Sequence, residues 1–431
     1  MSAVLASPRG IAEVLGDIAP GARLYVPGGS GEPSGLIEAL QSNKLLTAGS
    51  AITTTFLPGV NKIDLAALHE TAVVSSLFMQ SDYGAAQRDG RFRHMPLSYS
   101  AFQAWLEADA TFDVSIVQVS APDEQGRCSL GAAVEFTPAA IRRSKKVVGV
   151  VNRQAPFVPN AASIQLEAFY ALVDVDAPLA TYGSGATDAV SLDVARNVAP
   201  LIEDASVLQV GIGKTPGALL ELLRDRRELA LWSGMLSDGV IDLAAAGALR
   251  GDRALTGCMA LGTQRLYDWI QGNADVHIAG CDVTHNPLNL FAIPRLVAVN
   301  AAIEVDLFGQ CNLERLGGRA ISGAGGAPDF SRAGRHAAQG KSIVALPSTG
   351  GGVSRIVPVL DGSAVTTIPR TDVDFIVTEL GAADLRGKSV FERAEAIMAV
   401  AAPRFATELE RAWRKIRGWW DWVGRPACRF C

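Results

Sequence analysis

One construction occurs twice in this chain, about 180 residues apart, and it constrains the fold more than any other feature. Residues 24–40 have the pattern of a short strand, a glycine-rich turn and an apolar helix, and residues 207–223 repeat that order. Glycine adopts turn conformations that are closed to other residues, which suits a sharp strand-to-helix connection. The repeat predicts two similar open α/β domains in tandem, which we place at residues 1–186 and 187–431.

Short apolar runs elsewhere support parallel sheets covered by helices on both faces. The clearest runs are Asp113–Val119, Lys146–Val151, Leu296–Asn300, Ser342–Leu346 and Asp374–Thr378. Open α/β sheets bind ligands at the carboxyl ends of their strands. We therefore expect the chemistry beside the polar turn Ser233–Gly239, which follows an apolar run at Leu229–Trp232. The less regular segment 152–187 is the predicted linker.

Composition excludes several classes of protein. The 431 residues are 48% hydrophobic and 19% charged, with a formal net charge of −5. The densest basic run, residues 142–146, is too short to predict a nucleic-acid groove. No apolar run is long enough to span a membrane, and the amino terminus lacks the pattern of a secretion signal. The six cysteines are scattered, and the tail pair Cys428 and Cys431 has no second ligand pair, so we expect a cytoplasmic protein without a metal site.

Sequence segments that follow one another in the same order as in a known family, over most of the chain, carry a resemblance to that family. They include DVSIVQVSAPDEQGRCSLGAAVEFTPAA, LQVGIGKTPGALLELL, MLSDGVIDLAAAGAL, NAAIEVDLFGQ, ISGAGGAPDF and FIVTELGAADLRGKS. The chain resembles class I coenzyme A (CoA) transferases of the acetyl-CoA hydrolase/transferase family, the group similar to 4-hydroxybutyrate CoA-transferase. The resemblance implies two similar α/β domains, acyl-CoA and carboxylate substrates, CoA as co-substrate, no metal, nicotinamide or flavin, and a homodimer or larger assembly.

The resemblance also implies a mechanism and a set of site residues. In this family a glutamate attacks the thioester, and CoA then returns to form a glutamyl-CoA thioester before an acceptor carboxylate takes it over. Each addition creates an oxyanion that needs hydrogen-bond donors. Asn300 matches the family's asparagine before the Glu-Val-Asp motif and is expected to orient the nucleophile or donate to the oxyanion. Gly323, Gly325 and Gly326 match the family's loop along the thioester arm of CoA. Gly211 and Gly213 are further expected contacts with CoA. From their own chemistry, Ser348 and Arg355 either bind the CoA phosphates or cap a turn.

One position departs from the family pattern. The nucleophilic glutamate of the family lies in the motif Ser-Glu-Met-x-Ser-Asp-Gly, whereas this chain reads Ser-Gly-Met-Leu-Ser-Asp-Gly from Ser233 to Gly239. Gly234 therefore occupies the glutamate's position. Glycine has no side chain that could attack a thioester, so the usual covalent route is not available at Gly234.

Three functions remain open after this substitution. In the first, the chain is a transferase that uses another nucleophile. Glu32 in the first glycine turn is the leading candidate for that nucleophile, followed by Glu124 and Glu135. Glu32 equally suits a structural role, because a carboxylate stabilises the amino end of a helix. Alternatively, Gly234 leaves space for water or an acceptor carboxylate, which predicts an acyl-CoA hydrolase or a transferase that uses a ternary complex. The third function is acyl-CoA binding without turnover.

Two further interpretations concern His285 and the glycine turn at residues 211–213. His285 in the His-Asn-Pro turn is either a general base or a packing residue. A nicotinamide-binding Rossmann fold is disfavoured, because Gly211-Ile212-Gly213 lacks the third glycine of that fingerprint.

Overall fold

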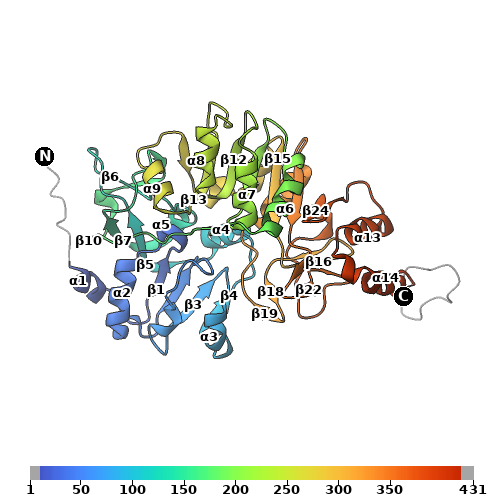
Figure 1. Cartoon of the computed structure of the whole chain (residues 1–431). Coiled ribbons are helices and arrows are strands. Elements are labelled where there is room, and N and C mark those ends of the chain that lie inside the picture. The colour runs from blue at the N-terminus through green and yellow to red at the C-terminus, as the bar shows by residue number, and fades with distance from the viewer. Residues whose placement is uncertain (1–9, 419–431) are drawn as a thin grey trace.

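The computed structural model describes residues 10–418 and contains two large sheets, each flanked by helices (Figure 1). The first sheet has seven parallel strands in the order β10-β7-β5-β1-β2-β3-β4. Its strands are β1 (Arg23–Val26), β2 (Ala51–Thr54), β3 (Val73–Ser76), β4 (Phe92–His94), β5 (Phe112–Val119), β7 (Ser144–Asn152) and β10 (Ala171–Val175). We call this sheet and its helices the N-terminal domain.

The second sheet has nine strands in the order β25-β24-β20-β15-β11-β12-β13-β14-β8. Its strands are β8 (Asn160–Ala161), β11 (Val207–Val210), β12 (Ala230–Leu236), β13 (Leu255–Ala260), β14 (Val276–Ile278), β15 (Leu296–Ala301), β20 (Lys341–Ala345), β24 (Phe375–Thr378) and β25 (Gly381–Asp384). Only β25 pairs antiparallel within it. This sheet and its helices form the C-terminal domain, so the predicted pair of tandem α/β domains is confirmed.

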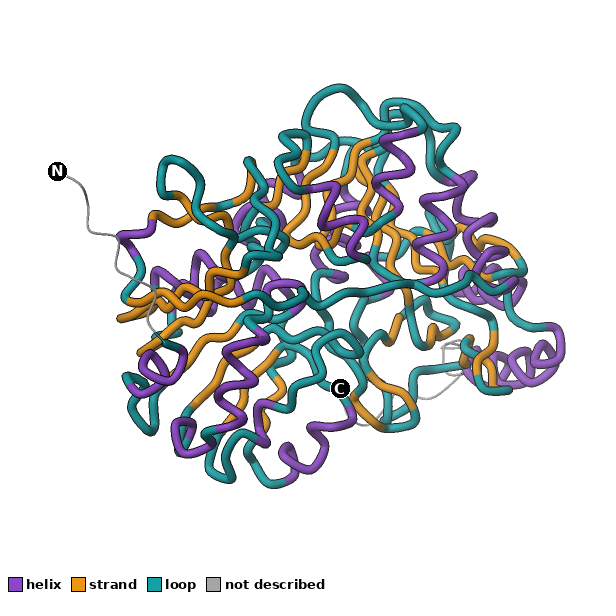
Figure 2. Tube along the Cα trace, turned by 60° about the vertical axis from the view of Figure 1, so that its left-hand side comes forward, coloured by secondary structure: helices purple, strands orange, loops and turns teal. Residues whose placement is uncertain are grey.

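The helices pack beside these strands, while loops fill the region where the two domains meet (Figure 2). They are α1 (Ile11–Gly16), α2 (Ser34–Ser42), α3 (Gly84–Arg88), α4 (Tyr99–Ala108), α5 (Thr137–Arg142), α6 (Ala189–Val198), α7 (Lys214–Leu222), α8 (Gly239–Ala245), α9 (Gln264–Ile270), α10 (Cys281–Thr284), α11 (Pro287–Phe291), α12 (Ala327–His336), α13 (Val390–Ala399) and α14 (Ala406–Arg417). Within residues 10–418, no helix is both long and apolar enough to cross a membrane.

Short ladders complete the chain. They are β6 (Arg127–Ser129) with β9 (Ser163–Gln165), β16 (Glu304–Asp306) with β17 (Cys311–Asn312) and β23 (Ile356–Val357), β18 (Arg315–Leu316) with β19 (Arg319–Ala320), and β21 (Thr349–Gly350) with β22 (Val353–Ser354). Helix α14 buries Trp413 against Phe308 and Phe391, so this tryptophan packs within its own domain. The tail cysteines Cys428 and Cys431 lie outside the described residues.

Two local predictions need correction. Segment 152–187 is more than a linker, because it supplies β10 to the first sheet and β8 to the second. These strands are only five and two residues long, and they are too short to show a clear periodicity. The predicted turn at Ser233 instead continues β12 as far as Leu236, since Met235 stays in register with Met259 of β13. The boundary at residues 186 and 187 falls between β10 and α6 and stays a prediction.

The two domains share a continuous apolar interior. Cys258, Met259 and Leu261 of the C-terminal domain belong to the same buried cluster as the strands of the first sheet. The backbone N–H of Val134 also donates to the carbonyl of Cys258, at 3.0 Å. This interior holds the carboxyl ends of strands from the second sheet against loops of the N-terminal domain, and that junction contains a cavity.

Candidate active site

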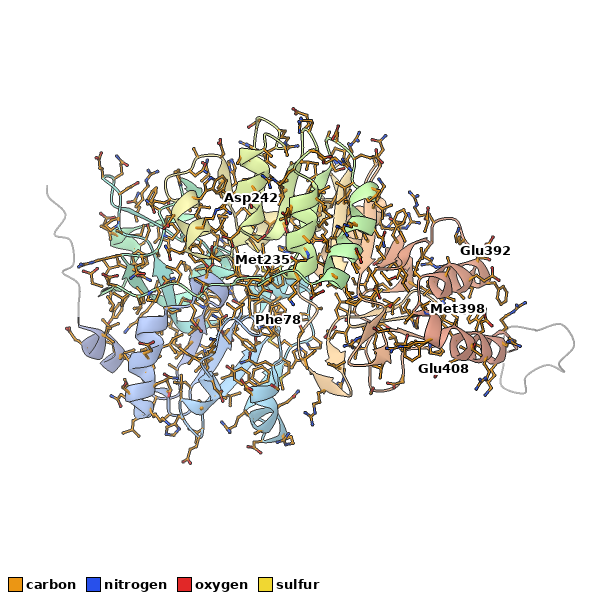
Figure 3. All side chains as sticks on the ribbon, viewed as in Figure 1. Phe78, Met235, Asp242, Glu392, Met398 and Glu408 are labelled. Carbon is orange, nitrogen blue, oxygen red and sulfur yellow. The ribbon has the colours of Figure 1, made fainter. Side chains whose placement is uncertain are left out.

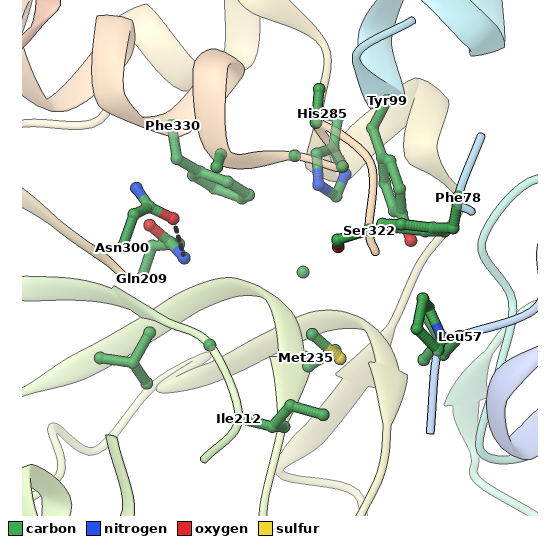
Figure 4. Close-up of a pocket in the computed structure, with 18 residues that line it drawn as sticks. Leu57, Phe78, Tyr99, Gln209, Ile212, Met235, His285, Asn300, Ser322 and Phe330 are labelled. Atoms are coloured by element: carbon green, nitrogen blue, oxygen red, sulfur yellow. Dashed lines mark hydrogen bonds between the residues drawn. The ribbon is translucent and has the colours of Figure 1, made fainter. Parts of the chain in front are cut away.

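A cavity of about 270 Å³ lies where the two domains meet. Phe78 of the N-terminal domain and Met235 of the C-terminal domain both line it, and they lie near the middle of the molecule (Figure 3). Its lining residues are Leu57, Pro58, Phe78, Tyr99, Gln209, Val210, Gly211, Ile212, Gly234, Met235, His285, Asn300, Ser322, Ala324, Gly325, Gly326, Ala327 and Phe330 (Figure 4).

Strand order explains why three distant segments meet in this cavity. Strands β15, β11 and β12 are neighbours in the second sheet and run parallel. Asn300, Gln209 and Gly234 lie toward their carboxyl ends. Parallel neighbours bring their carboxyl ends to one edge, which is the usual ligand-binding edge of an open α/β sheet.

Gly234 leaves open space on the cavity wall. A Cβ atom built on Gly234 would lie 3.5 Å from Nε2 of His285, which is ordinary van der Waals contact. The Cys258 thiol donates to the carbonyl of Gly234 at 3.0 Å and holds the backbone in place. The position therefore tolerates a side chain, and its glycine is not required by crowding.

Two amide side chains form a fixed pair on one side of the cavity. Gln209 Nε2 donates to Asn300 Oδ1 at 3.3 Å, and Asn300 Nδ2 donates to the Ser331 hydroxyl at 3.1 Å (Figure 4). Both amides are buried. One N–H of Asn300 remains available, because an amide nitrogen carries two hydrogens. Gln209 Oε1 has no hydrogen-bond partner among the described residues, so it offers a ligand an acceptor.

The glycine-rich loop before α12 is held by the N-terminal domain. The N–H of Tyr99 donates to the carbonyl of Gly325 at 3.0 Å. Asp329, in the first turn of α12, accepts hydrogen bonds from the hydroxyls of Ser98 and Ser100. These contacts place the amino end of α12 at the cavity wall, where backbone N–H groups favour negative charge.

His285 is fully buried, with 0% of its surface exposed. Its ring lies between Tyr99 and Phe330, with ring-centre distances of 4.7 and 4.9 Å. Nδ1 contacts the Thr284 hydroxyl at 2.9 Å, and Nε2 has no partner within residues 10–418. Burial lowers the pKa of His285 to about 3, so the ring is neutral near pH 7.

Cys258 and Cys281 bring two thiols close to this histidine. The ligand-type atoms of these three residues lie within 4.8 Å of one another. Burial raises the pKa of both thiols, which keeps them protonated, whereas metal ligation requires thiolates. The Cys258 thiol is already used as a donor to Gly234, so hydrogen bonding and packing account for the cluster.

Comparison with known proteins identifies the family. The acetyl-CoA hydrolase/transferase N-terminal domain model matches residues 9–200, and the corresponding C-terminal domain model matches residues 262–413. The chain belongs to the acetyl-CoA hydrolase/transferase family. It is 33% identical to the 4-hydroxybutyrate coenzyme A transferase of Clostridium kluyveri over 89% of this chain and 92% of that protein. An acetyl-CoA hydrolase of Kluyveromyces lactis is 28% identical over 70% of this chain and 65% of that protein.

A solved structure has the same fold. The crystal structure of RipA from Yersinia pestis superposes with a TM-score of 0.87 at 28% identity, covering 95% of this chain and 97% of that one. Members of the acetyl-CoA hydrolase/transferase family are enzymes that transfer or hydrolyse CoA thioesters, and the transferases use CoA thioesters as co-substrates. The family resemblance drawn from the sequence motifs is therefore confirmed.

Most of the glycines predicted to contact CoA lie at the cavity. Gly211, Gly325 and Gly326 line it together with Gly234 and Asn300. Gly323 lies between Ser322 and Ala324, which are both lining residues. Gly213 instead lines a smaller neighbouring cavity beside Ser237 and Asp238.

Glu32, the leading substitute nucleophile, is not among the lining residues. Burial raises its pKa to about 7, and a hydrogen bond with Asn61 partly offsets that rise. Asn61 Oδ1 in turn accepts from the N–H groups of Gly29 and Leu57. Through Asn61, Glu32 is connected to the loop that carries the lining residue Leu57, and its role as nucleophile stays a prediction.

The two other carboxylates also lie outside the lining. Glu124 is exposed on its loop. Glu135 is buried, with a φ of 40°, and accepts from the Tyr99 hydroxyl at 3.2 Å and the Thr55 hydroxyl at 3.3 Å. Burial raises the pKa of Glu135 to about 8. It is therefore mostly uncharged at pH 7 and supports the cavity through Tyr99.

Glu135→Gln is expected to remove a pH-dependent loss of stability. A buried acid with a raised pKa keeps its proton in the folded chain while the unfolded chain loses it, so stability is full below about pH 4.5 and declines toward about pH 8. The amide mimics the protonated acid. The free energy of unfolding of the unmodified chain should fall relative to Glu135→Gln by up to about 1.4 kcal/mol per pH unit in that window. Urea denaturation at pH 5 and pH 8 measures this, with exposed Glu124→Gln as the control; parallel pH profiles would contradict it.

Ser348 and Arg355 are not brought to the cavity. The N–H and hydroxyl of Ser348 both donate to the carboxylate of Glu379. The guanidinium of Arg355 packs against Gly350 of the β21–β22 hairpin. Their predicted contact with CoA phosphates stays a prediction, and Ser348 would have to exchange its present partner.

Sequence reasoning missed two lining residues with informative chemistry. Gln209 is a polar residue within the apolar strand Val207–Val210, and that contrast was the available signal. Tyr99 gave no comparable signal, because its role depends on contacts with His285 and Glu135, which lie far away in the sequence.

Proposed function

We propose that this chain is a CoA transferase in which the acceptor carboxylate attacks the acyl-CoA directly, in a ternary complex. One observation carries the proposal: the cavity wall is open at Gly234, and none of its lining residues is a carboxylate. Gly234 occupies the position of the family's nucleophilic glutamate. An external carboxylate in this space would take over that glutamate's role.

The reaction balances without a protein nucleophile. The acceptor carboxylate adds to the thioester carbonyl, and the carbon–sulfur bond breaks to give a mixed anhydride and CoA thiolate. The thiolate then adds to the acceptor's own carbonyl and expels the original acyl group as a carboxylate. The products are a new acyl-CoA and a free acid.

Each addition to a carbonyl group creates an oxyanion, and polar groups around Gly234 are placed to stabilise it. The free N–H of Asn300 and the glycine-rich turn at Gly325–Gly326 provide polar groups around the cavity. The apolar residues Leu57, Phe78 and Met235 restrict water around the thioester.

Direct transfer predicts sequential kinetics and no covalent intermediate. Initial rates with varied acyl-CoA and acceptor should give intersecting lines in a double-reciprocal plot, and mass spectrometry after incubation with acyl-CoA should find no glutamyl-CoA adduct. Glu32→Gln should then retain turnover. Parallel lines with an adduct on Glu32 would contradict direct transfer and establish Glu32 as the nucleophile.

Acyl-CoA hydrolysis is the second candidate. Acetyl-CoA hydrolases belong to the same family, and the unpaired acceptor atoms Gln209 Oε1 and His285 Nε2 would suit a bound water. Release of free thiol in water alone supports hydrolysis, whereas release that requires an added carboxylic acid supports transfer. CoA binding without either reaction would favour a binding protein. The homodimer and the cytoplasmic location remain predictions.

A further inference from the structure

The hydrogen bonds of Thr284 indicate which tautomer His285 adopts. The Thr284 hydroxyl donates its single hydrogen to the carbonyl of Gly280 at 3.1 Å. With that hydrogen assigned to the carbonyl, the hydroxyl accepts in its 2.9 Å contact with His285 Nδ1, so Nδ1 carries the ring hydrogen. Nε2 consequently presents a lone pair.

That lone pair lies at the cavity beside Gly234. Nε2 is 3.5 Å from a Cβ built on Gly234 and 2.5 Å from one built on Gly326. The ring edge thus lies against two glycines, and a side chain at position 326 would collide with it. Figure 4 shows the His285 ring beside the open part of the cavity, between Phe330 and Tyr99.

Within residues 10–418, no charged side chain lines the cavity at Nε2 of His285. The lining residues include no Lys, Arg, Asp or Glu. The titratable groups packed against the ring are Tyr99 from α4, Cys258 from β13 and Cys281 from α10, and burial raises the pKa of each, so all three are neutral near pH 7. Behind Tyr99, buried Glu135 is also mostly protonated. A bare carboxylate here would be a buried charge without a counter-ion, which is strongly unfavourable.

We propose that the acceptor carboxyl group binds at His285 Nε2 together with one proton, shared between the acid oxygen and the imidazole. The inference rests on the proposed function only in taking a carboxylic acid as the ligand. The complex is net neutral, whether the proton lies on oxygen or on nitrogen. His285 then serves as counter-ion and as base.

The same proton stays in the site throughout the transfer of CoA. It lies on Nε2 while the second carboxyl oxygen attacks the thioester, and the imidazolium faces the departing CoA thiolate. When the original acyl group is expelled as a carboxylate, that carboxylate takes the acceptor's place beside the proton. No other acid or base is required.

Proton uptake is the measurable signature. Near neutral pH the free acceptor is ionised, and burial keeps the imidazole of His285 unprotonated. Binding must therefore draw one proton from solution. Above the ordinary pKa of the acid, the affinity for the acceptor should fall about tenfold per pH unit.

Calorimetric titration of the full chain tests this directly. Acetate and butyrate are titrated between pH 6 and pH 8 in two buffers with different ionisation enthalpies, and the expected uptake is about one proton per carboxylate bound. Butyramide, an uncharged analogue of the acid, should bind without proton uptake. His285→Gln places a non-titrating amide near the position of Nε2, and it should abolish measurable binding of acetate and butyrate, because their charge then has no counter-ion. It should retain butyramide binding, which also shows that the variant is folded.

Several results would overturn the inference: affinity for carboxylates that does not change with pH, equal proton uptake in His285→Gln, or no binding of either carboxylate. Failure of the proposed function looks different. CoA transfer with a pH-independent affinity for the acceptor would leave the transferase in place and remove the role of His285. Proton-linked carboxylate binding without thioester turnover would support His285 as the carboxyl site and contradict the transferase.

Discussion

Gly234→Glu is expected to give a chain that forms a covalent glutamyl-CoA thioester. A Cβ at this position meets only the edge of the His285 ring, at 3.5 Å, so the new side chain has room to extend along the cavity. Its carboxylate would occupy the space that we assign to the acceptor. Transfer should then change from sequential to ping-pong kinetics, and mass spectrometry should detect the adduct on residue 234.

Gly234→Gln is the matched control for this substitution. It has the same size but is not a carboxylate nucleophile, and it fills the space in which the acceptor would bind. Turnover should fall about 100-fold or more, because a displaced reactant loses its attack geometry. If Gly234→Gln retained full activity, the cavity at Gly234 would not be the site of transfer. If Gly234→Glu were active without an adduct, the attacking group would lie elsewhere.

Gly323→Ala is expected to destabilise the chain strongly. A Cβ at Gly323 would lie 2.1 Å from the carbonyl oxygen of Leu77 and 3.2 Å from Cα of Phe78, and backbone atoms cannot move aside as a side chain can. The loop is also tied there by the hydrogen bond from the N–H of Met79 to the carbonyl of Ser322. The free energy of unfolding should drop by about 1–3 kcal/mol or more, and turnover should drop with it.

Urea denaturation measures the loss of stability in Gly323→Ala, with Gly251→Ala as the matched control. No atom lies within 4 Å of a Cβ built on Gly251, and its backbone is not in the left-handed region. That control should change stability by no more than about 0.5 kcal/mol. Equal denaturation midpoints for the two variants would show that the contact between the glycine-rich loop and Leu77 does not constrain the folded chain.

The local sequence pattern was sufficient to predict an architecture of two tandem α/β domains. Glycine turns after Val26 and Val210 and runs such as Asp113–Val119 predicted parallel sheets, because strand and turn preferences act over a few neighbouring residues. Local pattern failed at β10 and β8, which are too short to show a periodicity, and at Ser233, where pairing with β13 extends the strand beyond its apolar residues.

The candidate active site also has features that short sequence segments predict and features that only the tertiary structure shows. The sequence by itself predicted that Gly234 occupies the family's glutamate position and that glycines follow the strand ends, since both are properties of short segments. Only the tertiary structure decided that Nε2 of His285 lies beside Gly234, that Asn300 pairs with Gln209, and that Glu32 is outside the cavity lining. These relations join residues tens to hundreds of positions apart. They follow from the order of strands in the second sheet and from the docking of the two domains, which no local periodicity encodes.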